Sequence, residues 1–466
     1  MTSTDIAKYV QHLKQNDFIW KDDTLYCFNG KFWERNVEII KLYISTELYD
    51  FMKNIIVECF WDDKDFNVMK NSLKRLKGQP FKKEIIETTK EYMKNNDIEF
   101  DSKWWLFGFN NMVYDLKEHK FRDYRFDDYI STTTGYDWIE PTQTQLEKIY
   151  EITIQILPNS ETRQLYLTIL STGLEGRCLE KLTISNGNGR NGKSLLDDMV
   201  LESLGNYGMM GNNAILFEIT KTGSNPEKNN MHKKRLIVFR EPPKNSKIQN
   251  SIYKELTGGG KFSARGHHEN ETEKKLYNTT ILECNDKPLF AEEPTRADLD
   301  RIIDIHFESY FTEDQQLLNS CKHIFRANKE YKTEDFKENH KCALLKILFE
   351  KYKIYAENEY KLNVSDSIKQ RTDKYLELSC DILGWFKDNY AQTNDKKDCI
   401  KLKDAFDKYK ESDFYFNLPK NKKREQNYKF FIEYFSKNLF YSKYYVERYK
   451  DKTNFLTYHI IKNDVE

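Results

Sequence analysis

The sequence contains no long apolar run. None of its hydrophobic stretches approaches the ~20 residues needed to cross a bilayer, and residues 1–17 lack the apolar centre and small-residue cleavage site of a signal peptide. Proline is scarce, with 9 residues in 466, while hydrophobic residues make up 39%, which argues against a disordered chain. We therefore expect an intracellular globular protein of the cytoplasm with no membrane partner.

Clustered cysteines and an excess charge of either sign are also absent. The eight cysteines are scattered, without a Cys-x-x-Cys pair or a histidine at zinc-ligand spacing, so we expect reduced thiols. Lys plus Arg and Asp plus Glu both total 74, which gives a formal net charge of +0. Any attraction to nucleic acid must therefore come from local basic surfaces.

The first third of the chain predicts a small mixed α/β module over residues 1–148. The length of 466 residues exceeds what one core usually serves, so several domains are expected. Residues 25–33 place Asn29-Gly30 between two aromatic-rich runs, which predicts a tight hairpin. Helical spacing then extends over residues 39–60 and, more weakly, 85–93, and two strand-like runs follow at residues 104–109 and 113–116.

The middle of the chain, residues 149–310, predicts a different architecture. A helical pattern over residues 149–172 precedes short β-branched strands that alternate with helices and polar loops between residues 181 and 307. This alternation is typical of a mainly parallel sheet covered by helices. The chemistry-bearing motifs lie in this part.

The remaining chain predicts a helical connector over residues 311–369, with a helix over 315–355, and a final domain over 370–466. The final domain shows three helical patterns followed by two strand-like runs, at residues 382–390, 400–409, 427–439, 444–449 and 455–461. Three helices and a terminal hairpin suggest a winged-helix-like domain.

A glycine-rich loop is the clearest motif: Gly187-Asn188-Gly189-Arg190-Asn191-Gly192-Lys193-Ser194. Glycines let backbone amides converge on a phosphate, and the loop lies between a strand pattern and a helix pattern, as a phosphate-binding loop requires. Lys193 would then lie between the β and γ phosphates, and Ser194 would ligate Mg²⁺. The loop predicts ATP and Mg²⁺ as cofactors. A chance match is the bland alternative, and the loop alone does not distinguish kinases, GTPases, transporters and motors.

Three further residues follow the loop in an order that suggests hydrolysis. Glu241 ends an apolar strand 48 residues after Lys193, and a strand neighbouring the loop strand would bring it to the same sheet edge to orient water and support Mg²⁺. Asn285 ends a third strand and could bind the γ-phosphate. Arg301 could reach a phosphate in a neighbouring subunit. Singly, each is as well explained as a solvated strand end, a turn former or a surface cap.

Taken together, these residues resemble a superfamily 3 helicase, a ring-forming AAA+ motor of viruses and plasmids. The similar branch contains the poxvirus and giant-virus primase-helicases and those of phages and plasmids. Its Lys-x-Leu-Thr-Gly-Gly, Ala-Arg, Asn-x-x-Pro and Arg-to-Phe signatures are matched in order by residues 254–259, 264–265, 285–288 and 301–307. The resemblance implies a P-loop AAA+ ATPase core flanked by the amino-terminal module and the winged-helix-like domain.

Some positions depart from this family pattern. Arg240 precedes Glu241 where many P-loop ATPases have a second acid, which leaves the direct magnesium contact open. Gly260 stands where relatives usually carry Asp, and Asn111 where they usually carry Gly. There is no room before residue 100 for a primase domain, so we expect no primer synthesis.

A hairpin between Arg265 and Lys275 is the candidate DNA contact. In superfamily 3 rings the equivalent hairpin lines the channel, which suggests Arg265, His267, His268, Lys274 and Lys275 as phosphate-binding residues. Such contacts would be salt-dependent and indifferent to sequence. A solvated turn is the alternative, because three glutamates lie nearby. Basic residues of the final domain would add to a DNA-facing surface or form an ordinary solvated face.

The resemblance implies an ATP-dependent DNA helicase in the replication of a virus or mobile element, acting as a homo-hexamer on single-stranded or forked DNA. A separate primase or polymerase would be a partner, and the site of action would be the host cytoplasm or a viral replication site. The alternative is an AAA+ origin-binding or loading factor that uses ATP for assembly. A small-molecule kinase is a third possibility, but it has no use for the hairpin.

Overall fold

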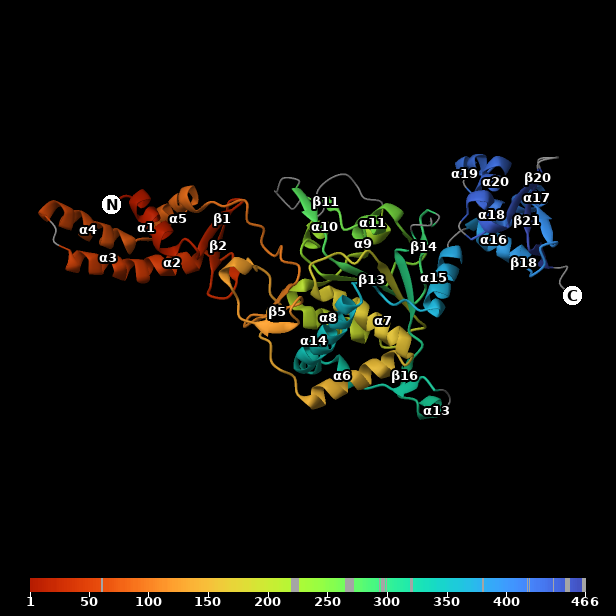
Figure 1. Cartoon of the computed structure of the whole chain (residues 1–466), viewed down its shortest axis with the longest axis horizontal. Helices are drawn as coiled ribbons and strands as arrows, with labels where there is room; N and C mark the ends of the chain where they lie inside the picture. The colour runs from red at the N-terminus through yellow and green to blue at the C-terminus, as the bar shows by residue number, and fades with distance from the viewer. Residues whose placement is uncertain are drawn as a thin grey trace.

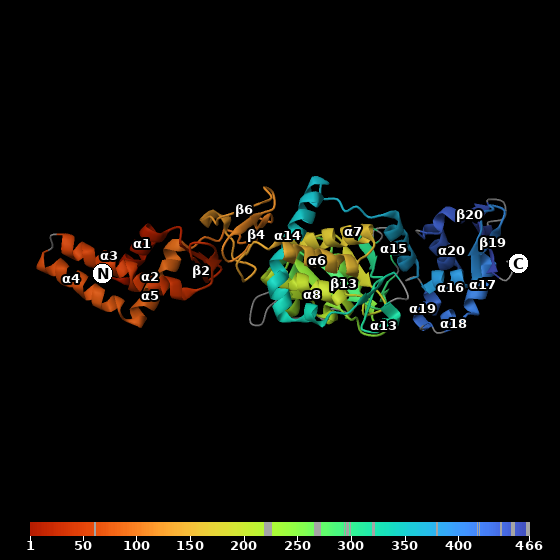
Figure 2. The same ribbon diagram turned by 90° about the horizontal axis from the view of Figure 1, so that it is seen from below.

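The computed structural model describes residues 1–59, 62–218, 226–264, 272–292, 294, 298, 300–318, 322–378, 381–416, 418, 420–438, 440–448 and 453–462. The described chain forms three bodies in a row: an amino-terminal helical module, a central sheet domain and a carboxyl-terminal domain (Figures 1 and 2). The central domain carries the candidate site.

The amino-terminal module is more helical than its sequence pattern suggests. Its elements are α1 (Ser3–Lys14), β1 (Phe18–Lys21), β2 (Thr24–Phe28), β3 (Trp33–Glu34), α2 (Val37–Ser45), α3 (Glu47–Glu58), α4 (Asp63–Leu76) and α5 (Gln79–Met93). The predicted hairpin is confirmed, with Phe28 opposite Trp33 in an antiparallel pair. The helical spacing predicted over residues 39–60 is confirmed, and it is divided between α2 and α3. It breaks at Thr46, whose backbone leaves the helical region at φ −115° and ψ −88°.

A small antiparallel sheet of β4 (Leu106–Gly108), β5 (Val113–Asp115) and β6 (Lys120–Arg122) follows. Its aromatic side chains pack into the core of the central domain: the ring of Tyr114 stacks on Phe349 with centroids 3.8 Å apart, and Phe107 meets Tyr207 at 4.7 Å. These strands therefore share a hydrophobic core with the central sheet. The proposed domain boundary at residue 148 falls inside the next helix, α6 (Gln143–Ile156).

The central sheet has five parallel strands in the order β15-β7-β13-β9-β8. Their bounds are β7 (Leu182–Asn186), β8 (Gly208–Met210), β9 (Leu236–Arg240), β13 (Thr279–Cys284) and β15 (Ile302–His306). Burial on both faces explains why β9 begins with a continuous apolar run, Leu-Ile-Val-Phe, instead of an alternating pattern. The predicted mixed α/β fold with a mainly parallel sheet is confirmed.

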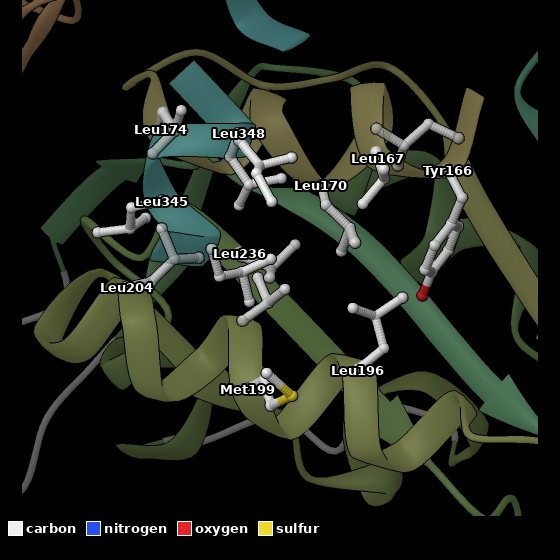
Figure 3. Close-up of a cluster of buried hydrophobic side chains, with 14 of the residues drawn as sticks. Tyr166, Leu167, Leu170, Leu174, Leu196, Met199, Leu204, Leu236, Leu345 and Leu348 are labelled. Atoms are coloured by element: carbon white, nitrogen blue, oxygen red, sulfur yellow. The ribbon is translucent and has the colours of Figure 1, made fainter. Parts of the chain in front are cut away.

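Helices cover both faces of this sheet. Leu236 and Val238 of β9 point to one face, which is covered by α6, α7 (Ser160–Ser171), α8 (Lys193–Leu204) and α14 (Glu334–Glu357). Figure 3 shows this core, with Leu196 and Met199 of α8 facing Leu236 and the leucines of α7 and α14. Ile237 and Phe239 point to the other face, against α9 (Asn213–Phe217), α11 (Asn250–Leu256) and α15 (Asp366–Leu378). Alternation along a strand makes this division.

Shorter elements decorate the central domain. They are α10 (Pro226–Asn230), the parallel pair β10 (Lys247–Ile248) and β14 (Leu289–Phe290), the antiparallel pair β11 (Lys261–Ala264) and β12 (Thr272–Lys275), the parallel pair β16 (Tyr310–Thr312) and β17 (Ile324–Arg326), and α13 (Gln315–Leu318). The uninterrupted helix predicted over residues 315–355 is wrong. In the first half of that range α13 covers residues 315–318 only, and β17 and a 3₁₀ turn at Lys329–Lys332 precede α14. Residues 334–355 are helical as predicted, and α14 continues to Glu357.

The carboxyl-terminal domain has its own aromatic core, built around Trp385, Phe386 and Phe431. Its elements are α16 (Asp381–Asn389), β18 (Tyr390–Gln392), β19 (Cys399–Lys401), α17 (Leu402–Lys410), α18 (Asp413–Phe416), α19 (Lys420–Glu425), α20 (Tyr428–Lys437), β20 (Tyr445–Arg448), β21 (Thr453–Thr457) and β22 (His459–Ile461). The three predicted helices and the β20–β21 hairpin are present. Within the described ranges, no helix is long and apolar enough to span a bilayer.

Candidate nucleotide site

The glycine-rich loop connects the carboxyl end of β7 to the first residue of α8, as the sequence predicts. Gly192 adopts φ +83°, and a Cβ there would lie 2.7 Å from Cγ1 of Ile156, so both conformation and space favour glycine. Gly192 precedes α8 and has no side chain to cap the helix, and the amide of Lys193 donates a long hydrogen bond of 3.5 Å to Oδ1 of Asn191. The amides at the start of α8 carry the positive end of the helix dipole, which favours an anion at this end of the helix.

Lys193 extends from this helix end back over the loop. Its Nζ donates to Oδ1 of Asn191 at 3.1 Å and to Oδ1 of Asn285 at 3.2 Å. The residue is only 3% exposed, and burial lowers the pKa of the ammonium, while the nearby carboxylate of Glu283 opposes that shift. The structure thus joins the loop lysine to the predicted polar residue at the end of β13.

These groups open onto a cavity of about 830 Å³. Loop residues 189–194, Glu241 and Asn285 line one side of it. The opposite side is formed by α6 and by the segment after β15, including Ile152, Phe311 and Tyr331. The volume suits a nucleotide-sized ligand, with apolar and aromatic walls beyond a polar, phosphate-sized end. No sequence pattern indicated that these residues line the cavity, because they come from segments distant from the loop along the chain.

Glu241 lies at the same edge of the sheet as the loop, but not on a strand beside β7. β13 separates β9 from β7, so the expected adjacency of the two strands is wrong. The carboxyl ends of parallel strands still meet at one edge, which is why Glu241 lines the cavity. Its backbone has φ +52°, an uncommon value for a residue with a side chain, and Asn213 Nδ2 donates to its carbonyl at 2.9 Å. The turn therefore holds Glu241 in one orientation.

Glu283 is a site residue that sequence reasoning missed. It lies within β13, is 1% exposed, and accepts a hydrogen bond from the Ser194 hydroxyl through Oε1. Its other oxygen accepts from Arg240 Nε at 2.5 Å, and Arg240 also donates to Asp198 at 2.9 Å. Burial alone would lower the pKa of Arg240, but Glu283 and Asp198 raise it overall. A lone Glu in a buried strand carries no recognisable pattern, so only the structure places it at the loop.

A second buried carboxyl, Asp197, lies on α8 beneath the loop. Tyr166 donates its hydroxyl to Oδ1 of Asp197 at 2.6 Å, and Figure 3 shows Tyr166 reaching from α7 toward α8. Oδ2 of Asp197 has no hydrogen-bond partner within the described part of the chain. Burial, reinforced by Glu283, raises the pKa of Asp197 to about 8. This group is therefore protonated at neutral pH.

Arg301 does not join the cavity. It precedes β15, and its carbonyl accepts from the amide of Leu182 at the start of β7, so it lies at the amino edge of the sheet. Its guanidinium donates to Thr257 Oγ1 at 3.2 Å. The five residues of β7, at ~3.3 Å each, separate this edge from the loop by about 16 Å. Arg301 could meet a bound phosphate only in another copy of the chain.

The predicted DNA-contacting hairpin is present in its stem. β11 and β12 pair antiparallel, with Lys261 opposite Lys275, before β13 begins (Figure 1). Lys274 belongs to β12, and the side chain of Lys275 is exposed. Arg265, His267 and His268 lie outside the described residues. Their role stays a prediction.

The donor set at the loop fits a hard cation. Ser194, Glu283, Glu241 and Asp198 supply oxygen atoms only, and Mg²⁺ is typically held by one or two carboxylates together with substrate phosphates. No group of three or more His, Cys, Asp and Glu side chains forms a metal cage in the described ranges. A cage is not needed if the phosphates contribute ligands.

Fold and site together define an α/β protein whose parallel sheet presents a glycine-rich loop at a helix amino terminus. Residues 7–162 match the family model described as D5 N terminal like. The chain is 28% identical over 355 residues to "Putative helicase L207/L206" of Acanthamoeba polyphaga mimivirus, covering 73% of this chain and 36% of that protein. It is 23% identical over 496 residues to "Putative helicase 121R" of Invertebrate iridescent virus 3, covering 93% and 52%.

A third relative is "Primase D5" of Fowlpox virus (strain NVSL), 28% identical over 295 residues, covering 59% of this chain and 37% of that protein. The chain is thus similar to viral proteins that bear the names helicase and primase, as the resemblance of its motifs predicts. It spans between about a third and about half of the length of these relatives. The A form of the NrS-1 C-terminal region overlaps at a TM-score of 0.41 with 13% identity, over 78% of this chain and 85% of that one, a likeness too weak for any inference.

Proposed function

We propose that the chain is an ATP-driven DNA helicase of superfamily 3 that acts in viral replication as a homo-hexameric ring. The observation that carries the proposal is that Lys193, bonded to Asn285, lines one cavity together with Ser194 and Glu241. Two of the relatives bear the name helicase and a third the name primase, which supports an enzyme acting on nucleic acid. A separate primase or polymerase would be its partner.

Each loop residue has a defined task in this proposal. The amides at the start of α8 and the ammonium of Lys193 hold the β and γ phosphates of ATP. Mg²⁺, when bound, neutralises phosphate charge, and the Ser194 hydroxyl is placed to ligate it. Glu241 orients the attacking water, and Asn285, already bonded to Lys193, contacts the γ-phosphate.

Arg301 completes the site from a neighbouring subunit. Its position at the amino edge of the sheet, about 16 Å from the loop of its own chain, prevents a contact within one subunit. In a ring, an arginine from the next copy can stabilise charge that develops on the transferred phosphoryl group. The hairpin residues Lys274 and Lys275 would hold the DNA backbone inside the ring.

The direct test measures ATP hydrolysis with and without single-stranded DNA, together with displacement of a strand from forked duplex. Lys193→Ala is expected to lower turnover by about 100-fold or more, since it removes a charge that acts on the transition state. Lys244→Ala, at an exposed lysine in the turn after β9, is the matched control and should hydrolyse ATP normally. Wild-type protein without ATPase activity, or a fully active Lys193→Ala variant, would refute the proposal.

Subunit mixing tests the ring. Arg301→Ala and Glu241→Gln are each expected to be nearly inactive. Random 1:1 mixing pairs an intact Glu241 with an intact neighbouring Arg301 at about a quarter of the interfaces, so about a quarter of wild-type activity should return. If mixing restores nothing while each variant still binds ATP, Arg301 does not act between subunits. The chain would then be closer to an assembly factor than to a ring motor.

A further inference from the structure

We propose that Glu283, from the middle strand β13, is the carboxylate that faces the metal beside Ser194, in place of an acid at position 240. This inference rests on the proposed nucleotide function and assigns the metal side of the same site. It would explain how the site functions with Arg240 at the position before Glu241, where a second acid would be expected. The proposed metal-facing carboxylate lies on β13, which is one strand nearer to the loop strand β7 than position 240 on β9.

The strand register supports this assignment. In the parallel pair of β13 and β9, Glu283 lies directly opposite Arg240, and in the pair of β13 and β7 it lies opposite Ser185. Glu283 is therefore closer to the loop strand than any residue of β9. Its backbone carbonyl also accepts from the amide of Glu241 at 3.0 Å. The two acids thus belong to one rigid segment of the sheet edge.

The contacts of Glu283 indicate a role beyond packing. A carboxyl group at 1% exposure within a fully buried strand carries a large desolvation cost unless both oxygens are bonded. One oxygen accepts from Arg240 and the other from the hydroxyl of Ser194. The second bond aims the carboxylate at the hydroxyl expected to ligate Mg²⁺. A carboxylate held against a metal-ligating hydroxyl either binds the cation or orients its water.

Arg240 is a positioning residue in this arrangement. It binds one oxygen of Glu283 and one of Asp198, whose side chain is 38% exposed at the cavity rim. The guanidinium thereby fixes the carboxylate plane and leaves Oε1 directed at Ser194. A purely structural ion pair would have no need of the Ser194 contact. The two roles are separable by experiment.

The test compares the affinity of a fluorescent ATP analogue in Mg²⁺ and in EDTA. Wild-type protein should bind more tightly with Mg²⁺, and Glu283→Gln, which keeps shape and one acceptor, should lose this gain by about 10- to 100-fold. Its affinity in EDTA should change little, which also shows that the variant is folded. Glu175→Gln is the matched control, because Glu175 is an equally buried glutamate paired with Arg177 outside the cavity lining.

A transposed pair gives a second test. Glu283→Ala should lose the Mg²⁺ gain, and Arg240→Glu combined with Glu283→Ala should restore part of it by returning a carboxylate to position 240. If Glu283→Gln keeps the full Mg²⁺ gain, or if Arg240→Glu restores nothing, the inference is wrong. Wild-type protein that binds no nucleotide in either buffer would instead overturn the proposed function. Should Glu283→Gln not fold, Glu283→Asp is measured for the same weakened gain.

Discussion

Replacing the buried carboxyl of Asp197 with an amide should change how the stability of the central domain depends on pH. In Asp197→Asn the Oδ1 acceptor for Tyr166 remains, and the ionisable group is lost. Burial raises the pKa of Asp197 to about 8 in the folded chain, far above the ~3.9 of an aspartate in water. The folded state thus keeps a proton that the unfolded state releases over this range.

The sign and the size follow from proton linkage. Below pH ~4 Asp197 is protonated in both the folded and the unfolded state, so its ionisation does not lower the free energy of unfolding there. Between about pH 4 and pH 8 only the unfolded state is ionised, so folding stability falls as pH rises, by about 1.4 kcal/mol for each pH unit. From pH 5 to pH 8 the loss approaches about 4 kcal/mol in this one group. Asp197→Asn removes that loss, so its advantage over wild type should grow with pH.

Hydrogen exchange of amides in α8 and β7 is the suitable assay, because it reports on the central domain alone. Wild type and variant are compared at the same pH, which cancels the intrinsic pH dependence of exchange. Asp388→Asn, at an exposed carboxylate of α16, is the control and should show no such trend. A difference between Asp197→Asn and wild type that stays constant from pH 5 to pH 8 would refute the reasoning.

Three other predictions concern separate parts of the central domain. Gly205→Ala should lower the free energy of unfolding by more than about 2 kcal/mol in thermal unfolding, because a Cβ would lie 1.9 Å from the carbonyl oxygen of Thr134 and Gly205 has φ +53°. Gly384→Ala is the control, because this helical position is open and the change should be neutral or stabilising. Lys287→Met should cost about 3–5 kcal/mol in urea unfolding by leaving the buried carboxylate of Asp304 without its cation, and Lys287→Arg should retain most of the stability. Lys275→Ala should weaken DNA binding at all sequences and reduce the slope of log affinity against log salt by about one unit, while Lys244→Ala leaves the slope unchanged.

Local sequence patterns were sufficient where structure is set by neighbours along the chain. The Asn29-Gly30 hairpin needs only a tight turn, and the strand, loop and helix around residues 182–204 need only short-range glycine geometry and helical spacing. Both are present as predicted. The mainly parallel sheet also follows from the alternation of strands and helices.

Features that depend on distant pairing were not predictable. β17 forms because Ile324–Arg326 pairs with Tyr310–Thr312, and the local composition of that stretch favoured a helix instead. The order of strands in the sheet placed β13 between β7 and β9, which nothing in the spacing of Lys193 and Glu241 could reveal. Glu283 was missed for the same reason. Its proposed role depends on its place opposite Arg240 in the β13–β9 pair, and Arg240 is 43 residues earlier in the chain.

The placement of Arg301 and the β11–β12 hairpin constrains how hydrolysis could act on DNA. β12 leads into the amino end of β13, and Arg301 precedes the amino end of β15, so both features belong to the edge of the sheet opposite the loop. β13 and β15 flank β7 on either side, so the hairpin stem and Arg301 are connected to neighbouring strands of one sheet. In the proposed ring, the arginine that contacts a neighbouring subunit's nucleotide would therefore be linked through the sheet to the hairpin of its own subunit. Loss of the γ-phosphate from the neighbouring subunit's site would release Arg301. The hairpin would then move together with any DNA bound to it, without a conformational change inside the sheet.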